Sequence, residues 1–216
     1  MKKRILALAL VLVMACTTLT GCVKVVPLNA ASNSADINGQ DDDFNAQAYI
    51  DGMFQSKAVP ALKAKAVDFT TLMTEAKGDL DTVGAKYGRR SQESSPYNFI
   101  VKGTATVEEI KTELRAGYVT LKIKGYTGNA VVKMACGPVF KGTSTRDSIE
   151  SIKFEDFKNQ VTFAALSTAI HTNLTKNLFS KIKVSELKGK TIDFYGTFAN
   201  EQSSEIWLTP FEITAK

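Results

Sequence analysis

The sequence has few of the residues from which metal centres and nucleophilic active sites are usually built. One histidine and three cysteines occur among its 216 residues. No CxxC pair, HExxH, GxSxG or P-loop motif occurs, so zinc hydrolysis, acyl transfer by a serine and nucleotide hydrolysis have no support. The single His171 lies beside Ile170 in a predicted helix, where a lone imidazole is more often a surface or half-buried residue than a ligand. We therefore predict no catalytic residue, no metal and no cofactor.

A strong positive charge is also missing once the N-terminal segment is set aside. The whole chain has 27 Lys and Arg against 22 Asp and Glu, a formal net charge of +5. Residues 1–21 hold three of the basic side chains and no acid, so without them 24 basic residues face 22 acidic ones and the net charge falls to +2. A nearly neutral domain lacks the electrostatic footprint of a nucleic-acid-binding protein. We expect no nucleic-acid partner.

The N-terminus has the layout of a bacterial export signal that ends in a lipidated cysteine. Basic residues 2–4 precede the apolar run ILALALVLVMA at residues 5–15, which is short for a membrane-spanning helix. The sequence LTGC at residues 19–22 then resembles a lipobox, in which small residues precede a cysteine that becomes a thioether to diacylglycerol. Cleavage after Ala15 and an uncleaved anchor are the alternatives, and bulky Met14 fits the first poorly. We predict lipidation at Cys22, where two or three acyl chains anchor a protein stably to a membrane.

This signal predicts an extracytoplasmic, lipid-anchored protein of the cell envelope. Val23 follows the modified cysteine, so the Asp that signals inner-membrane retention in many double-membrane bacteria is absent. In such a cell we expect the periplasmic side of the outer membrane. Cys16 leaves with the signal and Cys22 is acylated, so Cys136 has no partner for an intramolecular disulfide. Stability must therefore come from a hydrophobic core.

The chain divides into four predicted regions: a signal peptide at 1–21, the lipidated cysteine and a flexible tether at 22–43, an N-terminal helical segment at 44–90 and a β domain at 91–216 packed with it as one globular unit. The tether is rich in Ser, Asn and Asp, and its acids Asp41, Asp42 and Asp43 lack the spacing and glycine of a calcium loop. Pro60 is placed to open a helix. Seven apolar residues then step by four or three positions and favour a core-facing stripe, with docking onto another protein as the alternative: Leu62, Ala66, Phe69, Met73, Ala76, Leu80 and Val83. We expect Gly84 to end this helix.

Beyond residue 99 the period of the apolar residues changes from 3.6 to 2, which indicates strands. We predict strands at 100–110, 118–124, 130–136, 191–198 and 205–214, a short extra strand at 149–154 and a helix at 163–179. Pro210 must lie at an edge or a bulge, because it cannot donate a ladder hydrogen bond. Three strands, a helix and two strands form the order of an OB-fold, a small, partly open Greek-key barrel. We therefore predict an α+β fold, an OB-like antiparallel β-barrel preceded by an N-terminal helical hairpin, with a twisted open sheet as the alternative.

Candidate binding residues lie in polar stretches between these elements, where ligand contacts are usually found. KYGRR at 86–90 and PYNF at 96–99 combine guanidinium groups with aromatic faces, which suits carboxylate, phosphate or sugar. Arg146 and Asp147 could pair with each other or hold a polar ligand jointly, and Asn159 could cap the next helix or bind a ligand. Caps, turns and ion pairs are the structural alternative throughout. The candidate ligand-binding set is Arg89, Arg90, Tyr97, Asn98, Arg146, Asp147, Asn159 and Trp207.

Several motifs are spread over nearly the whole mature chain: LTGC, KYGRR, PYNF, VKGTA, GPVFKGTSTRD, FEDFKNQVTFA, KGKTIDFYGTF and WLTPFEIT. Together they resemble the DUF2291 family of predicted bacterial periplasmic lipoproteins. Family members are often encoded near sugar ABC-transporter components, so the resemblance implies an accessory role in carbohydrate uptake. It supplies no catalytic residues.

Three functions compete at this point. The leading hypothesis is a non-enzymatic, lipid-anchored binding or accessory module whose partners are a sugar ABC transporter or its binding protein, and carbohydrate itself. The second is a protein–protein adaptor of the envelope without a small-molecule site, which would expose the apolar stripe at 62–83. The third is an envelope hydrolase that uses paired acids such as Asp147 with Glu155 or Asp156, for which no separation can be read from the sequence.

Overall fold

The computed structural model describes residues 44–201 and 204–216. The predicted signal peptide, the lipidation site Cys22 and the tether lie outside the described residues. Within the described part of the chain, no helix combines the length and apolar character that a membrane crossing requires.

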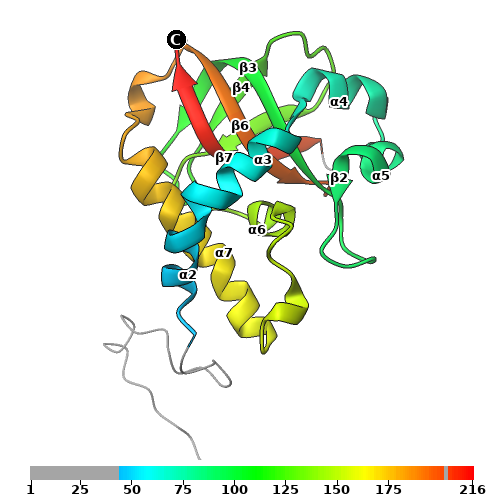
Figure 1. The fold of residues 1–216 in the computed structure, drawn as a ribbon. Helices are drawn as coiled ribbons and strands as arrows, with labels where there is room; N and C mark the ends of the chain where they lie inside the picture. Colours follow the sequence, from blue (N-terminus) through cyan, green and yellow to red (C-terminus); the bar gives the residue numbers. More distant parts are fainter. Residues whose placement is uncertain (1–43, 202–203) are drawn as a thin grey trace, which may run out of the picture. The chain divides into compact units, whose positions relative to one another are not determined.

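Five strands close into a barrel (Figure 1). They are β3 (Asn98–Lys111), β4 (Tyr118–Ile123), β5 (Val131–Ala135), β6 (Thr191–Ala199) and β7 (Glu205–Ala215). Their spatial order is β3-β4-β5-β7-β6, and β6 pairs again with β3, which closes the ring. Only the β5–β7 pair among these five strands is parallel. This confirms the predicted OB-like barrel, and the open-sheet alternative is wrong.

The alternation of apolar and polar residues explains why these segments form a barrel. Inward-facing side chains such as Val101, Val119, Met134 and Leu208 have almost no solvent exposure and fill the interior. The register of β6 and β7 shifts where Gly196 pairs with Pro210. As predicted, Pro210 lies at a bulge. Regular pairing is interrupted there, so the ladder does not need the hydrogen bond that proline cannot donate.

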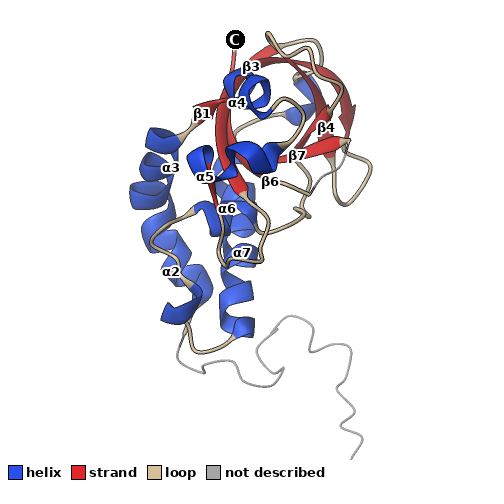
Figure 2. Ribbon diagram, turned by 90° about the vertical axis from the view of Figure 1, so that its right-hand side faces the viewer, coloured by secondary structure: helices blue, strands red, loops and turns tan. Residues whose placement is uncertain are grey.

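A helical layer lies against one side of the barrel (Figures 1 and 2). The helix α2 (Ala46–Met53) continues through a π-helical turn (Phe54–Ala58) into α3 (Val59–Lys65). The helix α7 (Gln160–Leu174) is flanked by the barrel strands β5 and β6 in sequence and continues as a π-helical turn, Thr175–Phe179. A second core joins the two helical stretches to the outer wall of the barrel, and it includes Ile50, Phe54, Leu62, Ile100, Leu166, Ile170, Leu174 and Phe211.

The apolar stripe at 62–83 does not form one helix. The chain leaves α3 at Ala66 and passes through β1 (Val67–Asp68), α4 (Phe69–Ala76), a 3-10 turn (Leu80–Val83), α5 (Gly84–Tyr87) and β2 (Gly88–Arg89). Positive φ values of 48° at Lys77 and 92° at Gly78 end α4, so the predicted end at Gly84 is wrong. The stripe nevertheless faces apolar cores, because Leu62 packs in the second core whereas Phe69, Ala76 and Val83 pack in the barrel core. Leu62, Phe69, Ala76 and Val83 are buried, so this stripe is not the exposed docking surface that the adaptor hypothesis required.

The predicted extra strand at 149–154 is also wrong. A turn occupies its first residues, and a 3-10 turn (Phe154–Asp156) follows. The short helix α6 (Ser144–Ser148) precedes it. Ile149 and Ile152 are buried in the second core, so the apolar residues of this segment serve the packing of a loop and not strand pairing.

Removing the Phe54 side chain tests whether the helical layer is held by this second core. Phe54 has no solvent exposure. We expect Phe54→Ala to lower the free energy of unfolding by about 3–5 kcal/mol in urea denaturation, because the lost burial and the residual cavity add. Leu114→Ala is the matched control, since Leu114 is largely exposed and surface changes usually stay within about 0.5 kcal/mol. Equal effects of the two substitutions would contradict this packing.

Candidate functional site

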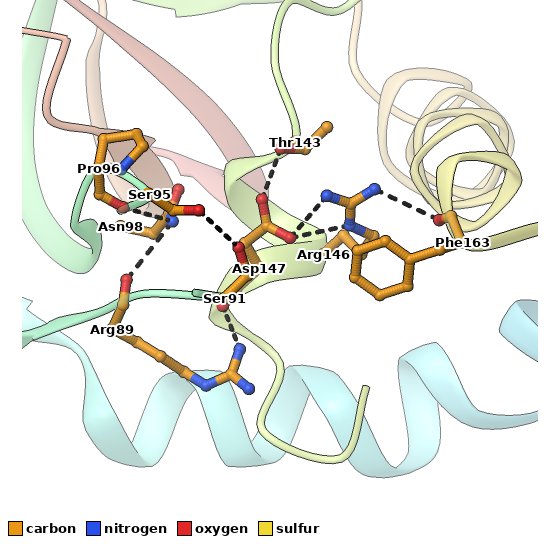
Figure 3. Close-up of polar contacts among 9 residues, drawn as sticks. All are labelled: Arg89, Ser91, Ser95, Pro96, Asn98, Thr143, Arg146, Asp147 and Phe163. Atoms are coloured by element: carbon orange, nitrogen blue, oxygen red, sulfur yellow. Dashed lines mark hydrogen bonds and ion pairs between the residues drawn. The ribbon is translucent and has the colours of Figure 1, made fainter. Parts of the chain in front are cut away.

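The eight candidate residues occupy separate places in the structure. Arg89, Asn98, Arg146 and Asp147 meet between the barrel and the helical layer (Figure 3). Arg90 and Tyr97 contact each other beside this group. Asn159 begins α7, and Trp207 lies on the outside of β7. The structure therefore does not bring all eight into one cleft.

The first group is built around a buried ion pair within α6. Arg146 Nε and Nη2 lie 2.8 and 2.7 Å from Asp147 Oδ1, and the side chains of the two residues are only 9% and 7% exposed. Thr143 Oγ1 donates to the other carboxylate oxygen at 2.5 Å. Arg146 also donates to the main-chain oxygen of Phe163 at 3.3 Å and stacks its guanidinium 3.9 Å above the Phe163 ring. The pair thus ties α6 to the first turn of α7.

Further hydrogen bonds tie the same helix to the barrel. Arg89 donates to the main-chain oxygen of Asp147, and Asn98 donates to the main-chain oxygen of Arg89 at 3.4 Å (Figure 3). On the other side of α6, the hydroxyls of Ser144 and Thr145 lie 3.1 and 2.8 Å from Thr197 Oγ1 on β6. All five residues of α6 are buried. These candidate residues therefore contact one another, which is the arrangement expected of the structural alternative.

Breaking this pair from one side is predicted to be costly. Arg146→Met keeps an unbranched apolar stem but leaves the Asp147 carboxylate buried without its main partner. We expect a loss of about 3–5 kcal/mol in the free energy of unfolding, because an uncompensated buried charge costs that much. Lys183→Ala is the control, since the ion pair of Lys183 with Glu186 is exposed and such pairs contribute about 0–1 kcal/mol. A loss below that of the control would show that Arg146 does not hold the fold.

The Arg90 and Tyr97 pair lies at the surface beside this buried group. The Arg90 guanidinium carbon lies 3.9 Å from the centre of the Tyr97 ring, and Arg90 also donates to the Tyr97 hydroxyl. The ring packs on Gly84, where an added Cβ would come within 2.2 Å of it. A cavity of about 530 Å³ lies against the pair and is also lined by Asp81, Ser94, Ser95, Pro96, Asn200 and Glu201.

Asn159 caps α7. Its side-chain oxygen accepts a hydrogen bond from the Thr162 amide at 2.9 Å. This is the contact expected of an Asn at a helix N-cap. The sequence left a helix cap and ligand binding open for Asn159, and the structure shows the helix cap.

Trp207 belongs to an aromatic and cationic surface on the outside of the barrel, which we call the Trp207 platform: Tyr118, Lys133, Lys141 and Trp207. The Tyr118 and Trp207 rings are 5.2 Å apart and nearly perpendicular. Lys141 Nζ lies 3.9 Å over the Trp207 ring, and Lys133 Nζ lies 4.8 Å over the Tyr118 ring. Lys133 pairs with Trp207 in the parallel β5–β7 ladder, so strand register places the ammonium group between the two rings.

Glu205 holds one edge of the platform in place. It accepts hydrogen bonds from Lys133 at 2.5 Å and from the Trp207 indole at 3.1 Å. These hydrogen bonds lower the pKa of Glu205 below its usual value. One carboxylate among two ammonium groups leaves the surface net positive, which suits an anionic ligand.

Sequence reasoning found only Trp207 in this platform. Tyr118 and Lys133 lie outward on predicted strands, but their contact with Trp207 depends on β5 pairing with β7, which are about 70 residues apart in the chain. Lys141 belongs to the loop GPVFKGTSTRD, of which only Arg146 and Asp147 were candidates. An aromatic residue facing outward on each of two strands was the signal that could have suggested the platform.

A groove of about 680 Å³ adjoins the platform at Glu205. It shares Asp81, Asn200 and Glu201 with the smaller cavity at Arg90 and Tyr97. Among the described residues that line the groove, four are acidic and none is basic; the acids are Asp79, Asp81, Glu201 and Glu205. Its apolar lining includes Met73, Leu80, Tyr126, Phe198 and Ile206. Within the described ranges, no cluster of three or more His, Cys, Asp and Glu side chains is arranged to hold a metal ion.

His171 lies apart from these surfaces and stacks on Phe140 with the ring centres 5.1 Å apart. Burial lowers the pKa of His171 from 6.5 to about 4, because the charged imidazolium is poorly solvated there. The neutral form is therefore the one that packs in the folded protein near pH 7.

This pKa predicts a pH-dependent contribution to stability. The unfolded state binds the extra proton from about pH 6.5 downward and the folded state only near pH 4, so His171 destabilises the fold as the pH falls through that window. The loss is up to about 3 kcal/mol, at about 1.4 kcal/mol for each unit of pKa shift. Urea unfolding at pH 7 and pH 4.5 should show a smaller difference for His171→Gln than for the wild type. The same difference in both proteins would contradict a buried neutral imidazole.

Comparison with known proteins agrees with this architecture and places the chain in the envelope. The family model described as "Predicted periplasmic lipoprotein (DUF2291)" matches residues 11–214. A crystal structure of an OB-fold protein from Thermotoga maritima superimposes with a TM-score of 0.62 and 14% sequence identity, covering 80% of this chain and 99% of that one. That likeness shows the fold alone. Among curated proteins, no significant match is found.

Proposed function

This chain belongs to the DUF2291 family of predicted periplasmic lipoproteins, and from that premise we propose that it is a non-enzymatic binding or accessory module, lipid-anchored through Cys22. The Trp207 platform is the observation that carries the proposal. It lies on the outer face of β4 and β5, which are the second and third barrel strands, and of β7, which pairs with β5. The face of the second and third strands is where OB-folds bind oligonucleotides and oligosaccharides.

The chemistry of the platform favours an acidic oligosaccharide as the ligand. Aromatic rings can stack on the apolar faces of sugar rings, and Lys133 and Lys141 can pair with carboxylates. Lys141 covers the Trp207 ring without a ligand, and displacing an exposed cation from a ring costs only about 0.5–1 kcal/mol. An incoming carboxylate would draw the ammonium group to itself and open the indole face for stacking.

We further propose that the module serves a sugar ABC transporter or its binding protein. Two observations support this proposal. The resemblance to the DUF2291 family implies it, since members of that family are often encoded beside such transporters, and the Trp207 platform suits carbohydrate. The hydrolase alternative loses its main candidate, because Asp147 is buried and bound to Arg146 and Thr143.

A protein–protein adaptor is the second candidate, and the acidic groove is the observation that favours it. Four acids and no base among its described lining residues suit a basic segment of a partner protein. Glu201→Lys reverses one of these charges at an exposed position. Loss of a co-purifying envelope protein in this variant, with oligosaccharide binding absent from the wild type, would favour the adaptor.

Thermal unfolding of the detergent-purified lipoprotein tests the binding role. We expect millimolar oligogalacturonate to raise the melting temperature, because a ligand at 100 times its Kd stabilises by about 2.7 kcal/mol. Neutral maltooligosaccharides should have a smaller effect. Trp207→Ala should reduce the affinity at least about tenfold, the equivalent of about 1.4 kcal/mol, whereas Lys183→Ala should leave it unchanged. No shift with either sugar class, or unchanged binding by Trp207→Ala, would refute the proposal.

A further inference from the structure

Five aromatic rings gather around the starts of α2 and α7, and we call them the aromatic end: Phe44, Tyr49, Phe154, Phe157 and Phe163. Phe44 and Tyr49 lie just before and within α2, and the other three surround the start of α7. Phe157 contacts Phe44, Tyr49 and Phe163 at ring-centre distances of 5.5, 6.0 and 5.8 Å. Phe154 contacts Phe163 at 5.3 Å. The rings therefore form one continuous cluster.

Part of this cluster is exposed to solvent. Tyr49 is 38% exposed and Phe154 is 37% exposed, and Val161 in the first turn of α7 is 44% exposed. Phe44 and Phe157 are half-buried against the second core, which fixes the exposed rings on a packed base. Isolated exposed apolar residues are normal on a protein surface, but a contiguous group of them is typical of an interaction site.

The position of the cluster indicates what it contacts. Phe44 is only 22 residues beyond Cys22 in the sequence, and a chain of that length reaches at most about 75 Å when fully extended. The start of α2 and the start of α7 both lie at the end of the helical layer that points away from the barrel (Figure 2). The aromatic end is thus the part of the folded domain that directly follows the connection to the lipid anchor.

We propose that the aromatic end docks on the phospholipid bilayer into which the lipid anchor inserts. Phe and Tyr rings are suited to the boundary between headgroups and acyl chains, because the ring is apolar and the tyrosine hydroxyl remains hydrated. The sequence next to the rings holds no excess of basic residues, since Lys153 and Lys158 accompany Glu155 and Asp156, and Asp41, Asp42 and Asp43 directly precede Phe44. Docking therefore depends on apolar contact and does not require anionic lipid. It adds a second, weaker attachment to the anchor.

Docking would set the orientation of the whole domain. The helices α2 and α7 lead from the aromatic end toward the barrel (Figure 2). The barrel would then stand away from the membrane surface and present its outer strands to the periplasm. This inference rests on lipid anchoring of the family and not on the identity of any ligand of the Trp207 platform.

Quenching by brominated lipid tests the proposal with the full lipidated protein in liposomes of phosphatidylcholine. Trp207 is the single tryptophan, so Trp207→Phe gives a silent background. Phe154→Trp and Val161→Trp place a probe at the aromatic end, and Leu114→Trp places a matched probe at an exposed apolar position in the loop between β3 and β4. Far-ultraviolet circular dichroism and melting temperature verify that each variant is folded.

Lipid brominated near the top of the acyl chains should quench about half of the Phe154→Trp and Val161→Trp fluorescence, because docked rings sit about 5–10 Å into the interface. The Leu114→Trp signal should change little, and adding anionic lipid should not strengthen the quenching. Absence of quenching at both aromatic-end positions, or equal quenching at Leu114→Trp, would overturn the proposal. Neither result depends on whether the protein binds sugar.

Discussion

The polar centre at α6, built around the buried ion pair of Arg146 and Asp147, links the helical layer to the barrel. Both charges are removed from water here. Their attraction offsets the cost of desolvation only if the remaining hydrogen-bonding positions of the two side chains are also filled. Thr143 and the Phe163 carbonyl fill two of them, while the hydroxyls of the same helix bond to Thr197 on β6. The start of α7, the edge at β2 and one barrel strand must therefore all be in position together. Apolar packing supplies most of the burial, and this polar centre fixes the arrangement.

This constraint separates the residues that build the protein from those that can bind. Arg89, Asn98, Arg146, Asp147 and Asn159 are engaged in internal contacts. The surfaces left for partners lie elsewhere: the Trp207 platform on the barrel, the acidic groove beside it and the aromatic end of the helical layer. The first two lie on the barrel side and the third on the side from which the chain leads to its anchor. A lipoprotein with this division can attach by one end and bind by the other.

Much of the fold could be predicted from the sequence, because β4 and the first half of β6 alternate buried and more exposed residues and the OB order of elements is distinctive. The stripe at 62–83 was misleading because its period continues past two helix ends, at Ala66 and at Lys77–Gly78, which local backbone conformation determines. The proposed binding surface was harder to predict. Contacts of Trp207 with Lys133 and Lys141 depend on strand pairing and loop position, and neither leaves a local pattern. The pairing of Arg146 with Asp147 was foreseeable as one of two options, but its burial was not.

A double-mutant cycle at Arg146 and Asp147 tests the central claim most directly. Urea unfolding of Arg146→Met, Asp147→Ala and the double variant gives the coupling free energy between the two side chains. If the pair holds the layers together, each single change leaves a buried charge unpaired, and the double variant should be more stable than the sum of the single losses by about 2 kcal/mol or more. Losses that add within about 0.5 kcal/mol would show two independent residues. That result would contradict the account in which one buried pair fixes the arrangement of barrel and helices.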